Sequence, residues 1–336
     1  MSTNKVLGGM LAAQLLLTIV MWSTGNQAKF EERALFDVKL EDISEFSIKR
    51  PKGDKHDEND VITIVKKQGK WLLPGYDDYV VDSGKVEDIL GRLTMAKIRR
   101  SVAKKKENHN ALSVGERDFT KHISLKTPER SYSLYVGNAK GTSMHARFDG
   151  QDEVYLARGV AAWKVSHELR NYVDTEYVNI EDVIELNIKN QHGQIDARQN
   201  EDGTWVVAQL PADKPLDVGR IRSIVNAAKQ VKLAIPVSRV AKPEFGLGKN
   251  ARATVRVKSR QDTFTYEIGA EDGEYTYVKA EHQEFFIKVR KFNVNASLKI
   301  KVDEFIDRSK LKKASPPTNG IPLDPKDWPK DLSPTP

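Results

Sequence analysis

The sequence contains no cysteine among its 336 residues. Disulfide bonds, thiolate nucleophiles, zinc ribbons and cysteine-ligated iron–sulfur clusters are therefore all excluded. Cysteine content alone leaves the redox compartment open. Any chemistry must come from other side chains or from binding surfaces.

Sequence patterns of catalytic and metal sites are also scarce. The seven histidines include no pair separated by three or four residues, so no local metal motif of the HExxH type exists. Asp77 and Asp78 form the best acidic pair, but they lie in a Pro/Gly segment without a nearby histidine, which favours a turn. No matched general acid and base can be named. We therefore expect a protein that is not an enzyme and that binds no cofactor or metal.

Three short motifs match functional signatures only in their letters. GLGKNA at Gly246 to Ala251 fits the dinucleotide fingerprint, but a strand-like run follows where a helix should begin. SVAK at Ser101 to Lys104 lacks the companion motifs of penicillin-recognising enzymes. GNAKGTS at Gly137 to Ser143 lacks P-loop spacing. These segments are interpreted as turns or chance matches.

Long hydrophobic runs are absent except for one near the N-terminus. Val6 to Trp22 is a 17-residue stretch without a charged residue. As a helix it would span about 26 Å, against a hydrocarbon core of about 30 Å. Lys5 precedes it, which favours a cytoplasmic N-terminus. The sequence predicts an anchor over residues 1–28, with the body on the far side of the membrane from the cytoplasm.

A cleaved signal peptide is the competing interpretation of this segment, because Ser23 to Gly25 offers small residues to a signal peptidase. Both interpretations export the body. If the segment stays in the membrane, small residues spaced by four and one glutamine favour contact with a second helix. The candidate contact residues are Gly8, Gly9, Ala12, Ala13 and Gln14.

The charge balance is moderately basic, with 54 Lys and Arg against 47 Asp and Glu, a net charge of +7. Positive residues are spread along the chain except between Lys97 and Lys106. That stretch is interpreted as a solvated helix end and loop, or as a contact for an anionic partner or lipid headgroups. We expect no nucleic acid partner.

One strand-like decamer occurs twice in the body. EDISEFSIKR at Glu41 to Arg50 and EDVIELNIKN at Glu181 to Asn190 agree at five positions. The GKW segment ending at Trp71 corresponds to the GTW segment ending at Trp205, each after an alternating apolar run typical of strands. Trp71 and Trp205 are therefore expected in the core. The repetition predicts two related modules.

Each copy continues into one amphipathic helix. Val80 to Ile98 aligns without a gap on Pro215 to Leu233, with apolar residues on one helical face in both. Asp82 and Asp217 occupy equivalent positions at which an N-cap aspartate would accept hydrogen bonds from the first turn.

Strand-like segments follow each helix and complete the pattern. Gly137 and Gly269 end equivalent strands. We therefore predict an α+β fold: an N-terminal transmembrane helix followed by two tandem modules, each a mostly antiparallel sheet with one main helix. The predicted repeats span residues 35–178 and 179–308. Seven of the 14 prolines lie in residues 316–336, so residues 309–336 are expected to form a disordered tail.

This arrangement resembles a bacterial family called domain of unknown function 4340. The resemblance rests on the N-terminal apolar segment, the GxW strands, the capped helices and a Phe245-Gly246-Leu247 turn, whose counterpart in the first copy is the degraded Ala111-Leu112-Ser113. The family consists of membrane-anchored proteins often encoded beside gliding-motility-type ABC transporters. The resemblance implies an accessory role at an envelope transporter, with the anchor in the bacterial inner membrane and the body in the periplasm. It brings no catalytic residues.

Three functions follow as hypotheses. The first is a non-catalytic periplasmic scaffold that binds membrane lipid and inner-membrane transporter subunits through its membrane helix and sheet surfaces. The second is a periplasmic lipid- or glycan-binding module that uses the cleft between the repeats. The third is a hydrolase whose residues meet only in three dimensions, which a cluster of histidines and carboxylates would support.

Overall fold

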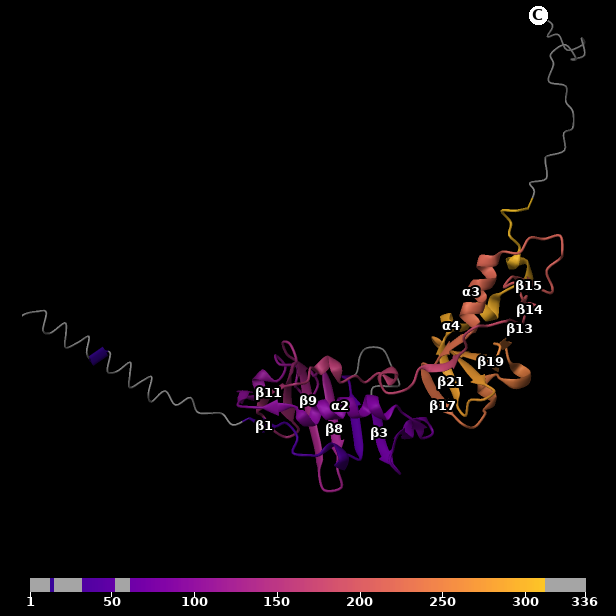
Figure 1. The fold of residues 1–336 in the computed structure, drawn as a ribbon. Coiled ribbons are helices and arrows are strands. Elements are labelled where there is room, and N and C mark those ends of the chain that lie inside the picture. The colour runs from indigo at the N-terminus through magenta and orange to yellow at the C-terminus, as the bar shows by residue number, and fades with distance from the viewer. Residues whose placement is uncertain (1–12, 15–31, 52–60, 312–336) are drawn as a thin grey trace, which may run out of the picture.

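The computed structural model describes residues 13–14, 32–51 and 61–311. Two lobes follow one another along the chain, the first from β1 to η5 and the second from β12 to η8 (Figure 1). Of the candidate membrane-contact residues, only Ala13 and Gln14 are described, as helical residues; Gly8, Gly9 and Ala12 lie outside the described residues. No described helix is long and apolar enough to cross a membrane.

The first lobe is built on a sheet of 11 strands in the described part of the chain. Its order is β1-β6-β11-β10-β9-β8-β2-β3-β4-β5, with β7 paired to β11. The strands are β1 (Arg33–Ala34), β2 (Glu45–Lys49), β3 (Val61–Lys67), β4 (Lys70–Leu73), β5 (Tyr79–Val80), β6 (Lys97–Ile98), β7 (Ser101–Ala103), β8 (Lys121–Lys126), β9 (Ser131–Asn138), β10 (Ser143–Phe148) and β11 (Val154–Arg158).

The second lobe holds an eight-stranded sheet and a two-stranded sheet among the described residues. The larger sheet has the order β15-β14-β13-β18-β19-β20-β21-β17, and β12 pairs with β16. The strands are β12 (Glu176–Asn179), β13 (Glu185–Asn190), β14 (Gly193–Gln199), β15 (Trp205–Val207), β16 (Gln230–Lys232), β17 (Ile235–Ser238), β18 (Ala253–Lys258), β19 (Thr263–Asp272), β20 (Tyr275–Ala280) and β21 (Phe286–Arg290).

The two large sheets share one strand order. The path β4-β3-β2-β8-β9-β10-β11 of the first lobe corresponds to β15-β14-β13-β18-β19-β20-β21 of the second. The repeated decamer supplies β2 and β13, each of which is an interior strand paired on both sides. All strand pairs are antiparallel in the described part of the chain, which confirms the predicted α+β class with mostly antiparallel sheets. The repeat boundaries remain predictions.

The two predicted helices begin at their predicted caps. The helices are α2 (Ser83–Met95) and α3 (Val218–Ala228). Asp82 accepts a hydrogen bond from the Lys85 amide at 3.2 Å, and Asp217 accepts one from the Arg220 amide at 2.9 Å. Each cap therefore satisfies an amide that has no partner within its helix. The apolar faces of both helices are buried, as the periodicity indicated.

A third helix, α4 (Lys291–Lys299), occurs in the second lobe and was not predicted. Its sequence, KFNVNASLK, has only a weak apolar stripe, so the periodicity gave no signal. The first lobe has a short 3₁₀ turn after the equivalent strand. The 3₁₀ helices are η1 (Leu40–Asp42), η2 (Pro74–Tyr76), η3 (Lys106–Asn108), η4 (Ala162–Lys164), η5 (Leu169–Asn171), η6 (Pro243–Phe245), η7 (Gly248–Asn250) and η8 (Val302–Phe305).

Gly137 and Gly269 lie in β9 and β19 where a loop carbonyl touches the strand. A Cβ on Gly269 would lie 2.0 Å from the Phe245 carbonyl oxygen, and one on Gly137 would lie 1.9 Å from that of Leu112. Gly246 follows Phe245 with φ of 61°, and Ser113 follows Leu112 with φ of 53°. Leu112-Ser113 is thus the counterpart of Phe245-Gly246, one residue later than the sequence alignment placed it.

The two repeated tryptophans differ in burial. Trp71 in β4 is fully buried, whereas Trp205 in β15 is only half-buried against the core. The difference follows from the sheet edge, because β5 covers β4 and β15 is the last strand of its sheet. The core assignment therefore holds fully for Trp71 and partly for Trp205.

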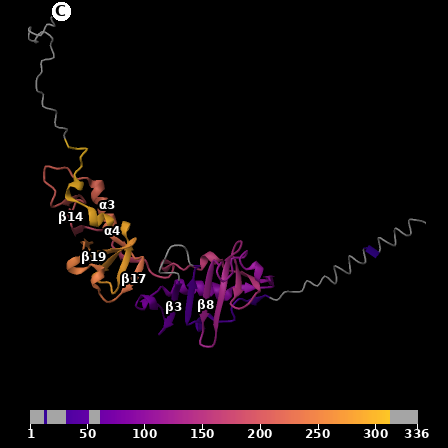
Figure 2. The same ribbon diagram turned by 180° about the vertical axis from the view of Figure 1, so that it is seen from behind.

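An aromatic residue near the C-terminal end of each lobe closes its core. Tyr172 and Phe305 are both fully buried. The Asp82 amide donates to the Tyr172 carbonyl, and the Asp217 amide donates to the Phe305 carbonyl, both at 2.8 Å. The start of each main helix is thus tied to the end of its own lobe. Figure 2 shows the lobes from behind, with β17 of the second lobe facing the end of the first that carries β3.

Candidate functional site

A clasp joins the lobes, formed by Asp77 and Tyr79 of the first and by Arg239, Glu284 and Phe285 of the second. The turn after η2 places Asp77 at φ of 57°, so its carboxylate accepts from the Arg239 amide at 2.8 Å. The Arg239 guanidinium donates to the Asp77 carbonyl and to Glu284. Of the acidic pair noted in the sequence, Asp77 thus contributes to a contact between the lobes, whereas Asp78 forms an ion pair with Lys67 of the first lobe at 3.1 Å.

Aromatic rings complete the clasp. Tyr79 meets the Phe285 ring edge-on at 4.7 Å, and the Arg239 guanidinium lies 4.2 Å from the centre of the same ring. Partial burial raises the pKa of the Tyr79 hydroxyl, and the nearby Asp174 charge raises it further. The edge-on ring contact and the cation–π contact add apolar contact area to hydrogen bonds that would be weak alone at a surface.

A cleft of about 400 Å³ lies where the lobes meet. The first lobe contributes Arg50, His167 and Arg170; the second contributes Lys232, Tyr275 and Arg290. Arg50 Nη1 lies 3.4 Å from His167 Nε2, and Glu168 forms an ion pair with Arg170. The contact between the lobes is therefore not a filled, flat surface. Its lining is mainly basic, with apolar side chains between the charges.

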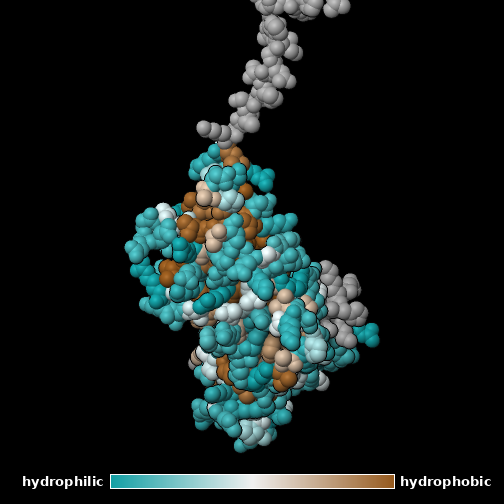
Figure 3. Space-filling model, turned by 90° about the vertical axis from the view of Figure 1, so that its right-hand side faces the viewer, coloured by the Kyte–Doolittle hydropathy of each residue, from teal (hydrophilic) through white to brown (hydrophobic). Residues whose placement is uncertain are grey.

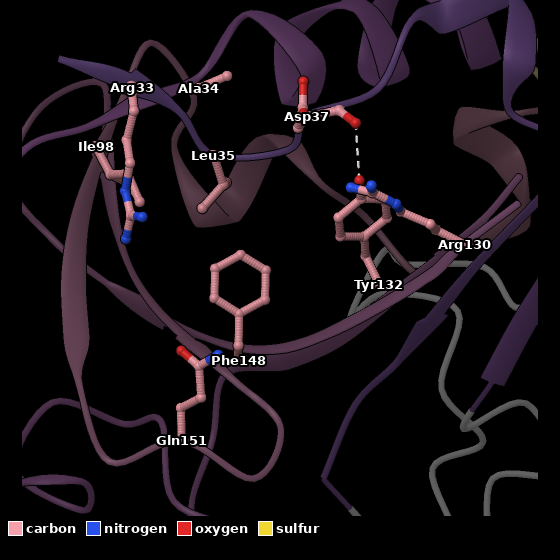
Figure 4. A pocket seen from close by; sticks show the side chains of 9 residues that line it. All are labelled: Arg33, Ala34, Leu35, Asp37, Ile98, Arg130, Tyr132, Phe148 and Gln151. Atoms are coloured by element: carbon pink, nitrogen blue, oxygen red, sulfur yellow. Dashed lines mark hydrogen bonds between the residues drawn. The ribbon is translucent and has the colours of Figure 1, made fainter.

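A second hollow of about 560 Å³ lies beside β1 (Figure 4). Phe148 and Leu35 point towards one another across it, while Arg33 and Arg130 flank it on opposite sides. The Tyr132 hydroxyl donates to the Asp37 carbonyl at 2.8 Å and holds the rim. Two arginines beside apolar side chains can contact an amphiphilic anion. All the residues that line this hollow come from the first lobe, so it is not a site between the lobes.

One polar cluster in the first lobe brings together the residue types of a hydrolase. His122 Nε2 lies 2.9 Å from Ser133 Oγ and 3.1 Å from an Asp149 carboxylate oxygen. A Ser-His-Asp relay needs the serine and the carboxylate on different ring nitrogens, whereas both contact Nε2 here. The Tyr135 ring packs 4.6 Å from the imidazole. This cluster does not support the hydrolase hypothesis.

Sequence reasoning missed this cluster because His122, Ser133 and Asp149 are distant in the chain and meet only through strand pairing. The pairing of β8 with β9 sets His122 opposite Tyr135. No group of three potential metal ligands occurs among the described residues.

The three segments with motif-like letters adopt local structures without a nucleotide or nucleophile geometry. Gly246 to Ala251 forms the turn and η7, and no long helix begins there. Ser101 lies in β7. Gly137 to Ser143 forms the hairpin between β9 and β10. The basic stretch from Lys97 to Lys106 spans β6 and β7, and its Arg99 forms a 2.9 Å ion pair with Glu32.

Polar residues cover most of the side of the molecule shown in Figure 3, and hydrophobic residues gather in separate small groups on both lobes. Two exposed aromatics follow equivalent strands: Trp163 after β11 is 66% exposed, and Phe292 after β21 is 72% exposed. These rings are available to a partner.

Comparison with known proteins gives one match. No curated protein and no solved structure is significantly similar to the chain. Residues 71–216, from Trp71 in β4 to the residue before the Asp217 cap, match the model of a family described as "Domain of unknown function (DUF4340)". The match crosses both lobes and the connection between them, and shows that this part of the chain is similar to that family.

Proposed function

We propose that the protein is a non-catalytic, single-pass membrane-anchored periplasmic subunit that holds partners in place within an envelope ABC-transporter-type complex. The observation that carries the proposal is the clasp. Arg239 contacts Asp77, Glu284 and the Phe285 ring at once, and so restrains the two lobes relative to each other. An elongated body with restrained lobes suits a spacer or scaffold, because such a protein must hold its partners at fixed relative positions.

The proposed partners are inner-membrane transporter subunits and membrane lipid. The apolar segment Val6 to Trp22 would contact a membrane helix through its small residues, and the sheet surfaces would contact the periplasmic parts. Trp163 and Phe292 favour such contacts, because exposed aromatic rings are common anchors at interfaces.

The test is affinity purification of the full chain from membranes in mild detergent after cross-linking. The proposal expects co-purification of membrane transporter subunits, reduced by the double change Trp163→Ser and Phe292→Ser. Val240→Ser is the matched control, because Val240 is 66% exposed but lies elsewhere. Recovery of the protein alone would refute the proposal.

A further inference from the structure

The cleft between the lobes concentrates positive charge from both of them. Its lining includes four Arg and Lys residues, namely Arg50, Arg170, Lys232 and Arg290, and one acid, Glu168. The balance is 4 − 1 = +3 with neutral histidine. Glu168 forms an ion pair with Arg170, and the other charged residues of the lining are positive. A cleft lined by one sign of charge attracts ligands of the other sign.

Two of these cations have no acidic partner in the described part of the chain. Lys232, at the end of β16, makes no ion pair or side-chain hydrogen bond there, and Arg290 only lies 5.9 Å from the centre of the Tyr275 ring. Some other basic side chains of the second lobe do have acidic partners: Lys288 contacts Asp272 at 2.5 Å, and Arg252 contacts Glu271 at 2.6 Å.

The rest of the lining indicates what kind of anion fits. Leu233, Ile235 and Tyr275 give the cleft an apolar and aromatic part beside the charges, and Asn293 adds an amide. A volume of about 400 Å³ lies within the usual range of small-molecule sites. Arginine and lysine together favour phosphate oxygens, which accept several charge-assisted hydrogen bonds.

We infer that this cleft binds a phosphate-bearing ligand whose organic portion packs against Tyr275 and Ile235. The phosphate lies between cations of both lobes, so the bound ligand strengthens the connection that the clasp makes. A phospholipid headgroup and a free phosphorylated metabolite share this chemistry. The inference does not rest on the scaffold role, since co-purification and ligand binding are measured separately.

The experiment is calorimetric titration of the full chain in uncharged detergent. The probes are inorganic phosphate, glycerol 3-phosphate and dihexanoylphosphatidylglycerol. The test variant is Lys232→Gln with Arg290→Gln, and the matched control is Lys189→Gln with Arg256→Gln. These control residues are also exposed and lie outside the cleft, so the net charge changes equally.

The expected result is binding of at least one probe by the unaltered chain, with Kd raised about tenfold or more in the test variant and unchanged in the control. Binding by the lipid alone identifies a headgroup, and binding by glycerol 3-phosphate or phosphate identifies a free ligand. The inference is overturned if none of the probes binds, or if both double variants weaken binding equally. Circular dichroism checks that each variant is folded.

Discussion

Replacing Gly269 with alanine should destabilise the second lobe by about 3 kcal/mol, at the upper end of typical overpacking costs. The added Cβ would lie 2.0 Å from the Phe245 carbonyl oxygen and 3.0 Å from that of Gly246. Both neighbours are backbone atoms, so no side-chain rotation relieves the clash. Either the turn after η6 must move away from the strand, or β19 must leave its register with β18 and β20.

The matched control is Gly91→Ala in α2. A Cβ at Gly91 has nothing within 4 Å, so this change should stabilise the helix by about 0.5–1 kcal/mol. Gly137→Ala tests the equivalent position of the first lobe, where the Cβ would lie 1.9 Å from the Leu112 carbonyl oxygen. Gly137→Ala should therefore destabilise the first lobe by a similar amount.

Hydrogen exchange of backbone amides is the suitable assay, because a two-lobed chain need not unfold in one step. Gly269→Ala should speed exchange in β18 and β19 with little change in β8 and β9, and Gly137→Ala should do the reverse. If Gly269→Ala leaves protection unchanged, or affects it no more than Gly91→Ala does, the close approach of loop and strand described here is wrong.

Three further predictions concern burial, capping and ionisation. Trp71→Ala should lower the unfolding free energy by about 3–5 kcal/mol, and Trp205→Ala should lower it clearly less, because only Trp71 is fully buried. Chemical denaturation measures both losses, and equal losses would contradict the prediction. Asp82→Ala should cost about 1 kcal/mol through loss of the α2 cap, and Asp82→Asn only part of that, both measured by thermal unfolding. Burial raises the pKa of Tyr177 to about 12, so stability is complete below pH 10, where unfolded tyrosine keeps its proton, and falls as the pH rises towards 12. Between pH 10 and pH 12, the unfolding free energy of the unaltered chain should fall by about 2–3 kcal/mol more than that of Tyr177→Phe. Parallel curves of unfolding free energy against pH for the two proteins would contradict this prediction.

The repeated pattern predicted the fold class and the helix caps because these depend on local rules. Period-two runs mark the strands, and an aspartate before an amphipathic stretch marks a helix start, so α2 and α3 begin where expected. The helix α4 was missed because its polar and apolar residues do not separate cleanly onto two faces. The offset of Leu112-Ser113 was missed because serine there adopts a backbone angle that sequence reasoning assigned to glycine.

The candidate sites were much less predictable than the fold. The clasp and the cleft each combine residues of both lobes, and their positions depend on how the lobes pack. Asp77 and Arg239 are far apart in the sequence and carry no shared pattern. The basic lining of the cleft carried no sequence signal, because only the tertiary structure brings Arg50, Lys232 and Arg290 to one opening.

The connection between the lobes is very short, and this limits how far they can move apart. Tyr172 still belongs to the first lobe through its bond to Asp82, and β12 of the second begins at Glu176. The three residues between them span about 10 Å when fully extended. If the clasp opened, the lobes could pivot about this tether but could not separate, so a ligand leaving the cleft would always find both halves of its site within reach.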